Sequence, residues 1–572
     1  MTSLVTKIKK GRPYYYAVDS ARVNGKPRII KQVYLGTIEK MMEASDLSKG
    51  SKIQEPDHAV VLEFGAIAAL LDLAERLGVR QIINDEVGKR SQGLPVGDSI
   101  LLAAINRAVR PVSKNVFFED WFLETVLPNS FPLANKKNLS SQGYWNNMSL
   151  ITSEAIRNIE DKITAQVVQK YNISTNCLLF DNTNFISYID TDNPSTLAKR
   201  GKSKEHRSDL RIVGLSLMVS PENNIPLFHE PYPGNTNDAK RFSEIIDSLK
   251  SRCQKIQQDT DLTLVFDRGN NSASNIEKLI QNDPFSFHYV GGLKQNQCQD
   301  LLMTPKEAYQ RLEGDTFGET TAFRATREEF GKAATVVVTD NPDLFRLQMR
   351  GITNNIEKCR QELTELAGKL KEREGGKKFR GQQYTEESVL SKVKNILTAE
   401  HMKNIFEYDI KTNNGYISLD FNINEEKFSY IKDHILGKSV LFTDRHEWTN
   451  EQIVGAYRAQ YHVEECFKQM KNNDYLTFTP IRHYTDKHIA VHSFYCVLAL
   501  TLASVLNLEF KRMGYKISIN TMLKELVKIK QVINYYILSN KNINKTTTFT
   551  EIKGIVKEYI DKYNLLKHAS KI

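Results

Sequence analysis

Cysteine is scarce in this sequence of 572 residues, and its placement forms no recognisable pattern. No two of the six cysteines stand in a C-x-x-C pair; they are scattered at Cys177, Cys253, Cys298, Cys359, Cys466 and Cys496. This distribution argues against a disulfide framework or a zinc ribbon. A reducing, cytoplasmic compartment is therefore expected.

Long apolar segments and nucleotide-binding motifs are equally rare. The N-terminal stretch MTSLVTKIKKGRPYYY carries basic residues but lacks the apolar run of a signal peptide. The stretch IAVHSFYCVLALTLASVLNL (489–508) has the length of a membrane span, but His492 and several small polar residues favour a buried core helix. No G-x-x-x-x-G-K-S/T loop occurs. We therefore expect neither a membrane partner nor a nucleotide cofactor.

Charge and composition describe a globular protein with an excess of positive charge. The chain has 78 lysines and arginines against 68 acidic residues, a net charge of +10, and 40% of its residues are hydrophobic. Such a chain is long enough and apolar enough to form several folded domains. The positive charge favours a polyanionic partner, nucleic acid first, although it does not identify one.

The N-terminal part divides into two modules with different periodicity. Residues 1–58 contain β-rich runs around an Asn24-Gly25 hairpin signal and predict a small β module. In residues 59–150 the apolar spacing becomes helical. A DNA-binding domain and a plain helical spacer are both compatible with this pattern, and we assign DNA binding.

The remainder predicts a ribonuclease H-like α/β core that is interrupted by an insertion. Three strand signals (177–189, 209–221 and 225–235) come first, and a helix signal (237–253) and further strands (262–269 and 285–294) follow. This order gives the first part of the core (170–300), an insertion of a helical hairpin plus strands (301–437), a second part (438–515) and a C-terminal helical region (516–572). The predicted fold class is therefore multidomain α/β, with the β module and the helical domain preceding the core.

Two aspartates occur where strands of the predicted core end. Asp181 follows LLF and Asp267 follows LVF, so each carboxylate ends an apolar triplet and is expected to point toward a sheet edge or cleft. A single such aspartate is usually structural. Two in one sheet favour a divalent-metal site, because hard cations bind carboxylate oxygens on a rigid frame.

A third acidic candidate lies in the stretch EWTNEQIVGAYRAQYHVEECFKQMKN (447–472). Thr449 and Gln452 form a capping-box pattern, which predicts a helix start. At about 100° per residue, one continuous helix would place four residues on its inward face: Tyr457, Gln460, Glu464 and Lys471. The same geometry turns Glu465 toward solvent.

These residues carry a family resemblance. The spacing of Tyr457, Gln460, Glu464 and Lys471 resembles the Y-x2-R-x3-E-x6-K signature of DDE transposases of bacterial insertion sequences. The similarity is to the IS-four superfamily, and within it to the sixteen-thirty-four branch. Other stretches agree in the same order along most of the chain: LLFDNTNF, GKSKEHRSDLR, PGNTNDAKRF and LVFDRGNNSASNI.

The resemblance implies roles for individual residues. Asp181, Asp267 and Glu464 would form the catalytic, metal-binding triad, and Tyr457, Gln460 and Lys471 would contact DNA-end phosphates. Gln460 departs from the signature, which has arginine there, and Arg458 or Lys468 is expected to compensate for the missing charge.

A basic tract between the first two predicted strands supplies further candidate phosphate contacts. Its cations outnumber Glu205 and Asp209, which favours phosphate binding over a merely solvated loop. The expected DNA contacts are Lys199, Arg200, Lys202, Lys204, Arg207 and Arg211, together with Arg268 next to Asp267.

The function implied by the resemblance is transposition. Two divalent ions can hold the attacking and leaving oxygens of an in-line phosphoryl displacement; Mg²⁺ suits an all-oxygen ligand set and Mn²⁺ is a tolerated substitute. The expected partners are the terminal inverted repeats of the element and target DNA, with a homodimer in the synaptic complex. A ribonuclease H-like nuclease without integration activity and a non-catalytic repressor derived from a transposase remain as alternatives.

Overall fold

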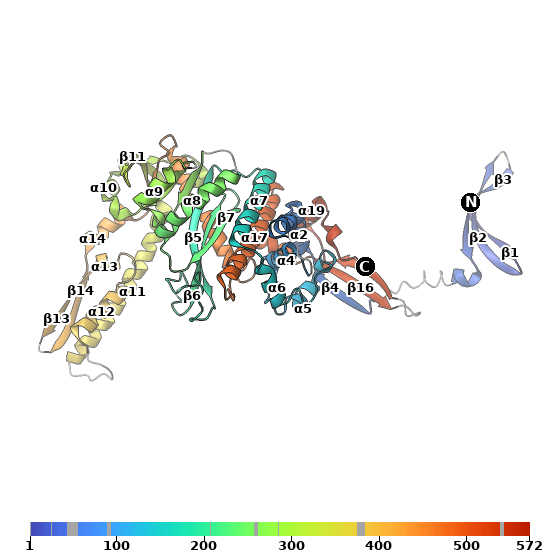
Figure 1. Ribbon diagram of the computed structural model, residues 1–572, viewed down its shortest axis with the longest axis horizontal. Helices are drawn as coiled ribbons and strands as arrows, with labels where there is room; N and C mark the ends of the chain where they lie inside the picture. The colour runs from blue at the N-terminus through green and yellow to red at the C-terminus, as the bar shows by residue number, and fades with distance from the viewer. Residues whose placement is uncertain are drawn as a thin grey trace. The chain divides into compact units, whose positions relative to one another are not determined.

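The computed structural model describes residues 2–23, 26–42, 55–88, 93–205, 207–256, 261–283, 285–374, 384–413, 415–537 and 543–571. The chain forms two compact units (Figure 1), Met1–Leu62 with Lys530–Glu551 and Lys571–Ile572, and Glu63–Ile529 with Ile552–Ser570. The predicted Asn24-Gly25 turn lies outside the described residues.

The first unit contains two small antiparallel sheets. One has the order β1 (Thr2–Lys9), β2 (Arg12–Val23), β3 (Lys26–Gly36), and the other has the order β17 (Ile543–Phe549), β16 (Lys530–Ile537), β4 (His58–Glu63). The C-terminal region is therefore not purely helical, which differs from the prediction. The stretches QVINYYI and KTTTF are rich in β-branched and aromatic residues, which fit a pleated sheet better than a helix.

The second unit includes a helical part built around one long buried helix, α17 (Asp486–Arg512). This helix is apolar and long enough to cross a membrane, but 94% of its most apolar window is buried inside the protein. The helices grouped with it are α2 (Gly65–Arg76), α3 (Val79–Val87), α4 (Val96–Val109), α5 (Phe117–Asp120), α6 (Ser141–Met148), α7 (Ser153–Tyr171), α18 (Ile519–Val527) and α19 (Gly554–Lys562).

A buried ionic network ties this helical part together. Arg76 donates to both carboxylate oxygens of Glu509, at 2.6 and 3.0 Å, and to Asp72 at 2.7 Å. Tyr171 also donates to Glu509, at 2.7 Å. Each buried carboxylate therefore has partners, and burial of a charge without a partner would cost several kcal/mol.

The candidate site lies on a nine-stranded sheet whose inner strands match the predicted strand order. The sheet order is β10 (Gln310–Arg311), β11 (Thr321–Glu329), β12 (Lys332–Asp340), β15 (Lys438–Thr443), β9 (His288–Leu293), β8 (Thr263–Phe266), β5 (Cys177–Ser187), β6 (Arg211–Val219) and β7 (Pro226–Pro233). Strands β5, β6 and β7 are antiparallel neighbours, whereas β8 runs parallel to both β5 and β9. Strands β10 to β12, from the range predicted as an insertion, extend this same sheet.

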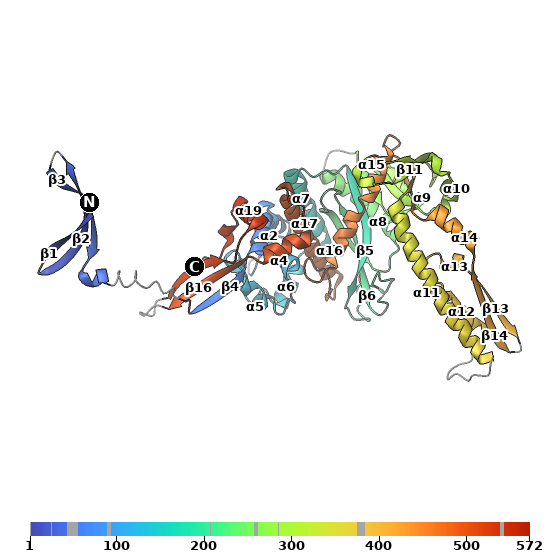
Figure 2. The ribbon, with the colours of Figure 1, turned by 180° about the vertical axis from the view of Figure 1, so that it is seen from behind.

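Different helices cover the two faces of the sheet. On one face, Phe180 of β5 and Phe266 of β8 pack against Phe242 of α8 (Asp238–Ile256), with ring centroids 5.1 and 5.0 Å apart. Helix α9 (Ala273–Ile280) packs beside α8. On the other face, α15 (Asn450–Arg458) contacts β8 and β9, and α16 (Tyr461–Met470) contacts β5 (Figure 2).

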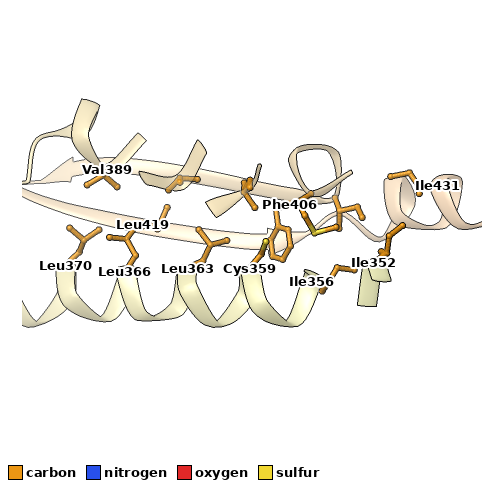
Figure 3. Close-up of a cluster of buried hydrophobic side chains, with 14 of the residues drawn as sticks. Ile352, Ile356, Cys359, Leu363, Leu366, Leu370, Val389, Phe406, Leu419 and Ile431 are labelled. Atoms are coloured by element: carbon orange, nitrogen blue, oxygen red, sulfur yellow. The ribbon is translucent and has the colours of Figure 1, made fainter. Parts of the chain in front are cut away.

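Residues between β12 and β15 form a subdomain with its own core (Figure 3). The predicted seam on α11 (Pro342–Glu374) is confirmed, because Ile352, Ile356, Cys359, Leu363, Leu366 and Leu370 are all buried. They pack against α12 (Glu386–Ile396), α13 (Met402–Ile405), β13 (Phe406–Asn413), β14 (Tyr416–Ile423) and α14 (Glu425–Tyr430). The predicted break at 375–381 lies outside the described residues.

Leu363 offers a test of this core. It is 0% exposed, whereas Leu347 on the same helix is 69% exposed. Leu363→Ala should lower the local unfolding free energy by about 2–5 kcal/mol, because it removes buried methyl groups and leaves a cavity. Hydrogen exchange of amides in α11 and β14 should accelerate accordingly. Leu347→Ala is the matched control, and equal acceleration in both variants would contradict the assigned core.

Candidate active site

Register pairing brings Asp181 and Asp267 together. Phe180 lies opposite Phe266 in the parallel β5–β8 pair, and each aspartate is the next residue along its chain. Because side chains alternate along a strand, Asp181 points to the face opposite Phe180, the face covered by α16. Phe185, on the same face as Asp181, stacks on Phe478 with a centroid distance of 4.0 Å.

Local hydrogen bonds orient the two carboxylates differently. Asp181 is half-buried, and its Oδ1 accepts from the backbone N–H of Asn182 at 2.7 Å. Asp267 is exposed and caps the short turn Arg268–Asn270, with its Oδ1 accepting from the Arg268 N–H at 2.8 Å. The sheet therefore supplies one sheltered and one accessible carboxylate at adjacent positions.

A buried polar chain supports β5 beneath Asp181. Arg241 of α8 donates through Nε to Ser216 Oγ at 3.0 Å, and Ser216 donates to Asn182 Oδ1 at 2.8 Å. All three side chains are at least 95% buried. The guanidinium also pairs with Glu230 at 3.3 Å. This chain anchors the residue whose N–H binds Asp181.

The electrostatic setting of Asp181 disfavours its ionised form. Burial raises the pKa of Asp181 to about 7, Lys204 opposes the shift, and the nearby carboxylates of Asp267 and Asp238 add to it. Burial and Asp267 likewise raise the pKa of Asp238, again against Lys204. Lys204 Nζ donates to the Asn182 carbonyl at 2.9 Å. Asp267 and Lys204 thus act on the pKa of both Asp181 and Asp238, in opposite directions.

Asp238 is a site residue that the sequence analysis did not single out. It begins α8, and a Cβ at Gly269 would lie 3.7 Å from its Oδ2, which places it beside the Asp267 turn. The only sequence signal is its position in PGNTNDAKRF, one of the stretches that carry the family resemblance.

Tyr457 reaches the two aspartates from α15. Its hydroxyl donates to Asp267 Oδ1 at 3.4 Å, and burial followed by Asp267 raises its pKa. The ring lies over Gly292 of β9, where an added Cβ would stand 2.4 Å from the hydroxyl oxygen. Glycine is therefore required at position 292 for this side chain to reach the site.

Glu464 shares a cavity with Asp267, Tyr457 and Gln460. The capping box of Thr449 and Gln452 is confirmed, but the continuous helix is wrong: α15 ends at Arg458 and α16 begins at Tyr461. Between them, i→i+3 hydrogen bonds join Gln460 N to Tyr457 O (3.1 Å) and His462 N to Ala459 O (2.9 Å).

Tighter turns of this kind rotate the following side chains relative to an ideal α-helix. The predicted exposure of Glu465 to solvent is accordingly wrong, whereas Glu464 and not Glu465 lines the cavity with Asp267. Glu464 is exposed, and its neighbour Glu465 is half-buried, accepts from Gln469 at 2.7 Å and pairs with Lys468 at 3.6 Å.

Gln460 and the two cations expected to compensate for its missing charge, Arg458 and Lys468, have different surroundings. The Nε2 of Gln460 is buried and donates to no described residue. Arg458 lines the same cavity and donates to Thr320 Oγ1 at 2.7 Å. Lys468 pairs with Glu465, so Arg458 is the better placed of the two.

The predicted phosphate contacts fall into two groups. Lys204 lies at the carboxylates, and Lys471 lies 5.6 Å from the Phe185 ring on the Asp181 face, with its pKa lowered by burial and by Lys204 and raised by Glu205. Arg268 is exposed beside Asp267 and lines a cavity with Tyr457.

The other cations of the basic tract are committed elsewhere or lie away from the carboxylates. Arg207 forms a two-point ion pair with Asp209, and Arg211 donates to the carbonyls of Thr191, Asn193 and Ala198. Lys199 pairs with Ile212 through its backbone. Arg200 and Lys202 are exposed on the loop. Arg211 is thus a structural residue of the loop, and Arg207 is neutralised.

The donor set suits a hard divalent cation, because it consists of carboxylate oxygens on adjacent rigid strands. A cation bound beside Asp181 would favour its ionised form and so lower the pKa that burial raises. Within the described part of the chain, no three His, Cys, Asp or Glu side chains stand close enough to hold one metal ion together. Asp181 and Asp267 directly follow register partners on adjacent strands, and Glu464 lines a cavity with Asp267.

A model of one protein family matches more than half of the chain. Residues 189–502 match the family described as the transposase DDE domain; the match includes Asp267 and Glu464 and begins after Asp181. No curated protein matches this chain in sequence.

Two solved structures resemble the chain with low sequence identity and low TM-scores. The cryo-EM structure of a piggyBac transposase synaptic complex with hairpin DNA has 11% identity and a TM-score of 0.36, over 80% of this chain and 79% of that chain. The Mos1 transposase paired-end complex with the left transposon end has 11% identity and a TM-score of 0.15, over 37% and 62%. At these TM-scores neither structure assigns a role to a residue of this chain.

The pKa of Asp181 predicts a pH-dependent stability. Its folded pKa of about 7 exceeds the ordinary value of 3.8, so the folded state binds more protons between these values and loses stability as pH rises through them. In EDTA at about pH 8, Asp181→Asn should therefore raise the unfolding free energy by on the order of 2 kcal/mol. Thermal denaturation at several pH values measures this.

Near pH 4 the difference between the two proteins should vanish. Added Mg²⁺ should raise the melting temperature of the wild type and not of Asp181→Asn. Asp192→Asn, which changes an exposed acid in the loop after β5, is the control. A pH-independent effect of Asp181→Asn would contradict the assigned electrostatics.

Proposed function

Because the chain belongs to the transposase DDE domain family, we propose that it binds the ends of its own insertion sequence, cleaves DNA there and joins the 3′ ends to target DNA. The observation that carries the proposal is that Asp181 of β5 and Asp267, the residue after β8, directly follow the register partners Phe180 and Phe266, and that Tyr457 donates to Asp267. The residue spacing around Glu464 supports the IS-four superfamily and a bacterial, cytoplasmic setting. The order β7-β6-β5-β8-β9 supports a ribonuclease H-like core.

We propose that Asp181, Asp267 and Glu464 hold the divalent ions on which members of this family generally depend, with Mg²⁺ as the natural ion and Mn²⁺ as a substitute. Ions held there would supply charge stabilisation to an in-line phosphoryl transfer. Glu464 shares a cavity with Asp267, but among the described residues no three acidic side chains form a metal-binding cluster, so the proposal requires α16 to bring Glu464 closer when a DNA end is bound. Asp238 is a further oxygen donor at the same edge.

The remaining residues act on the DNA end. Tyr457 is held over Gly292 and would orient the scissile phosphate beside Asp267. Lys204 and Lys471 flank the Asp181 face and would offset the charge of the approaching backbone, as phosphate contacts position a duplex without reading its sequence. The unpartnered Nε2 of Gln460 carries two N–H donors and no charge, where the signature arginine would bring five N–H donors and a positive charge.

The first test removes the paired aspartates. Asp181→Asn and Asp267→Asn should each reduce strand cleavage at the element's ends by at least about a thousandfold, because each variant lacks an ion-binding carboxylate. End binding, measured by electrophoretic mobility shift, should persist. Asp192→Asn is the control and should cleave like the wild type. Full cleavage by either site variant would exclude the catalytic assignment.

The second test separates the two adjacent glutamates. Glu464→Gln should abolish cleavage and strand transfer, whereas Glu465→Gln should leave both within a few-fold of the wild type. Both products are followed on a labelled end in Mg²⁺. The reverse result would mean that Glu465, which is half-buried against Gln469 and Lys468, turns toward the site. Cleavage without any joining would instead identify a nuclease.

A further inference from the structure

The turn between β6 and β7 holds the helix that carries Glu464. Asn224 lies in this turn, two residues before β7 begins, and its backbone carbonyl accepts hydrogen bonds from two helices. Cys466 of α16 donates to it through Sγ at 3.3 Å, and Ser504 of α17 donates through Oγ at 2.9 Å. The side chain adds a third contact, because Asn224 Oδ1 accepts from Nδ1 of His462. These three contacts are here called the Asn224 clamp.

The backbone conformation of Asn224 suits this role. Its φ of 55° lies in the left-handed region, which asparagine adopts more readily than most residues other than glycine. A hydrogen bond from the Ser220 N–H to the Ile225 carbonyl, at 3.0 Å, closes the turn. Most other residue types would therefore strain the turn, whereas glycine would keep the carbonyl contacts and remove only the side-chain contact.

The Asn224 clamp restrains α16 against rotation about its own axis. His462 and Cys466 are four residues apart and share one face of this helix. At about 100° per residue, Glu464 lies about 160° around the axis from both of them. A helix fastened on one side thus presents Glu464 on the other, where it lines the cavity with Asp267. Rotation of α16 would move Glu464 and break both contacts together.

The clamp also fixes α16 relative to the strand that carries Asp181. Asn224 follows β6, and Leu217 of β6 is the register partner of Asp181 on β5. Two of the donors are buried, since Cys466 is 1% exposed and Ser504 is 0% exposed. A buried donor that loses its acceptor is left without a hydrogen bond, which is unfavourable. The distance of α16 from the sheet therefore depends on this turn.

We infer that Asn224 is a positioning residue for the reaction of the paired aspartates and Glu464, because it sets where α16 holds Glu464. The inference rests on the proposed function for the reaction itself. Asn224 is not among the residues that line the cavity of Glu464 and Asp267, so it acts through α16 and not by contact with a DNA end. A displacement of a reacting group by about 1 Å can slow a reaction a hundredfold, so the restraint matters for rate.

A contribution to stability alone is the competing interpretation. The carbonyl contacts with Cys466 and Ser504 join two helices to the turn and would serve folding in any case. The contact between Asn224 Oδ1 and His462 is different, because it adds a second point of attachment on the same helix face. Removing the side chain while keeping the backbone therefore separates positioning from folding.

The first measurement compares Asn224→Gly with the wild type on a labelled duplex of the DNA that flanks the reading frame. At saturating protein in Mg²⁺, the single-turnover rate of cleavage should fall about tenfold, the factor expected when one hydrogen bond no longer positions a reacting group. The affinity for the same duplex, measured in EDTA, should not change. Cleavage at the wild-type rate would overturn the inference.

Matched variants identify the contact. Asn224→Asp keeps an acceptor oxygen for His462 and should cleave like the wild type, and Asn223→Ala, which changes the adjacent asparagine, is the control. His462→Phe removes the donor and should slow cleavage as much as Asn224→Gly does. The double variant should be no slower than either single variant, because both remove one contact. Additive losses, or failure of Asn224→Asp to restore the rate, would overturn the inference.

Hydrogen exchange of the full chain in EDTA follows α16 without DNA or metal. Asn224→Gly should accelerate the exchange of amides in α16 and leave those of α8, on the other face of the sheet, unchanged. Asn224→Asp should exchange like the wild type. Unchanged exchange in α16 would contradict the clamp, and equal acceleration in α8 would identify a general loss of stability and overturn the positioning role.

The two measurements together separate this inference from the proposed function. If the wild type cleaves and Asn224→Gly cleaves equally fast, the function stands and the positioning role is wrong. If the wild type does not cleave and exchange accelerates only in α16 of Asn224→Gly, the clamp stands and transposition is wrong.

Discussion

The parallel pairing of β5 with β8 is the constraint on which the candidate site depends. Phe180 and Phe266 are register partners, both are fully buried, and both pack against Phe242 of α8. A shift of one residue in β5 would turn Phe180 toward α16 and Asp181 into the core, since side chains alternate along a strand. Hydrophobic packing on one face of the sheet therefore determines which carboxylate appears on the other.

The close approach of α15 to β9 brings Tyr457 to the two aspartates. Tyr457 reaches Asp267 because Gly292 leaves room for its ring, and Gly291 likewise makes room for Phe442. Two adjacent glycines in β9 thus admit an aromatic side chain on each face of the strand. A strand without side chains at these positions packs less well by itself, and the rings of Tyr457 and Phe442 fill the space.

Acidic and basic side chains are concentrated in different parts of the chain. Asp181 and Asp267 lie on or directly after strands of the nine-stranded sheet, whereas residues 2–42 of the β1–β3 region hold nine cations against two acids, apart from the undescribed pair 24–25. For a protein acting on DNA, this division follows from electrostatic repulsion. Acids at the chemical step repel the phosphate backbone, so that affinity has to come from cations elsewhere.

The sequence by itself determined the core strands, the buried seam of α11 and the two aspartates, because these follow from short-range periodicity. The strands predicted at 177–189, 209–221 and 225–235 appear within two residues of those limits as β5, β6 and β7. Apolar periodicity of this kind is sufficient to predict a helix or strand wherever one face of that element is buried.

Only the tertiary structure decided where the glutamate helix breaks, that Asp238 lies beside the Asp267 turn, and that β16 lies between β17 and β4 in one sheet. The tight turn at Gln460 changes the phase of every later residue, which no helical projection from the sequence contains. The position of Asp238 depends on how α8 packs against a strand that follows it in sequence. Strand β4 is far from its partners along the chain. Each of these features rests on contacts between distant segments, and such contacts exist only after the chain has folded.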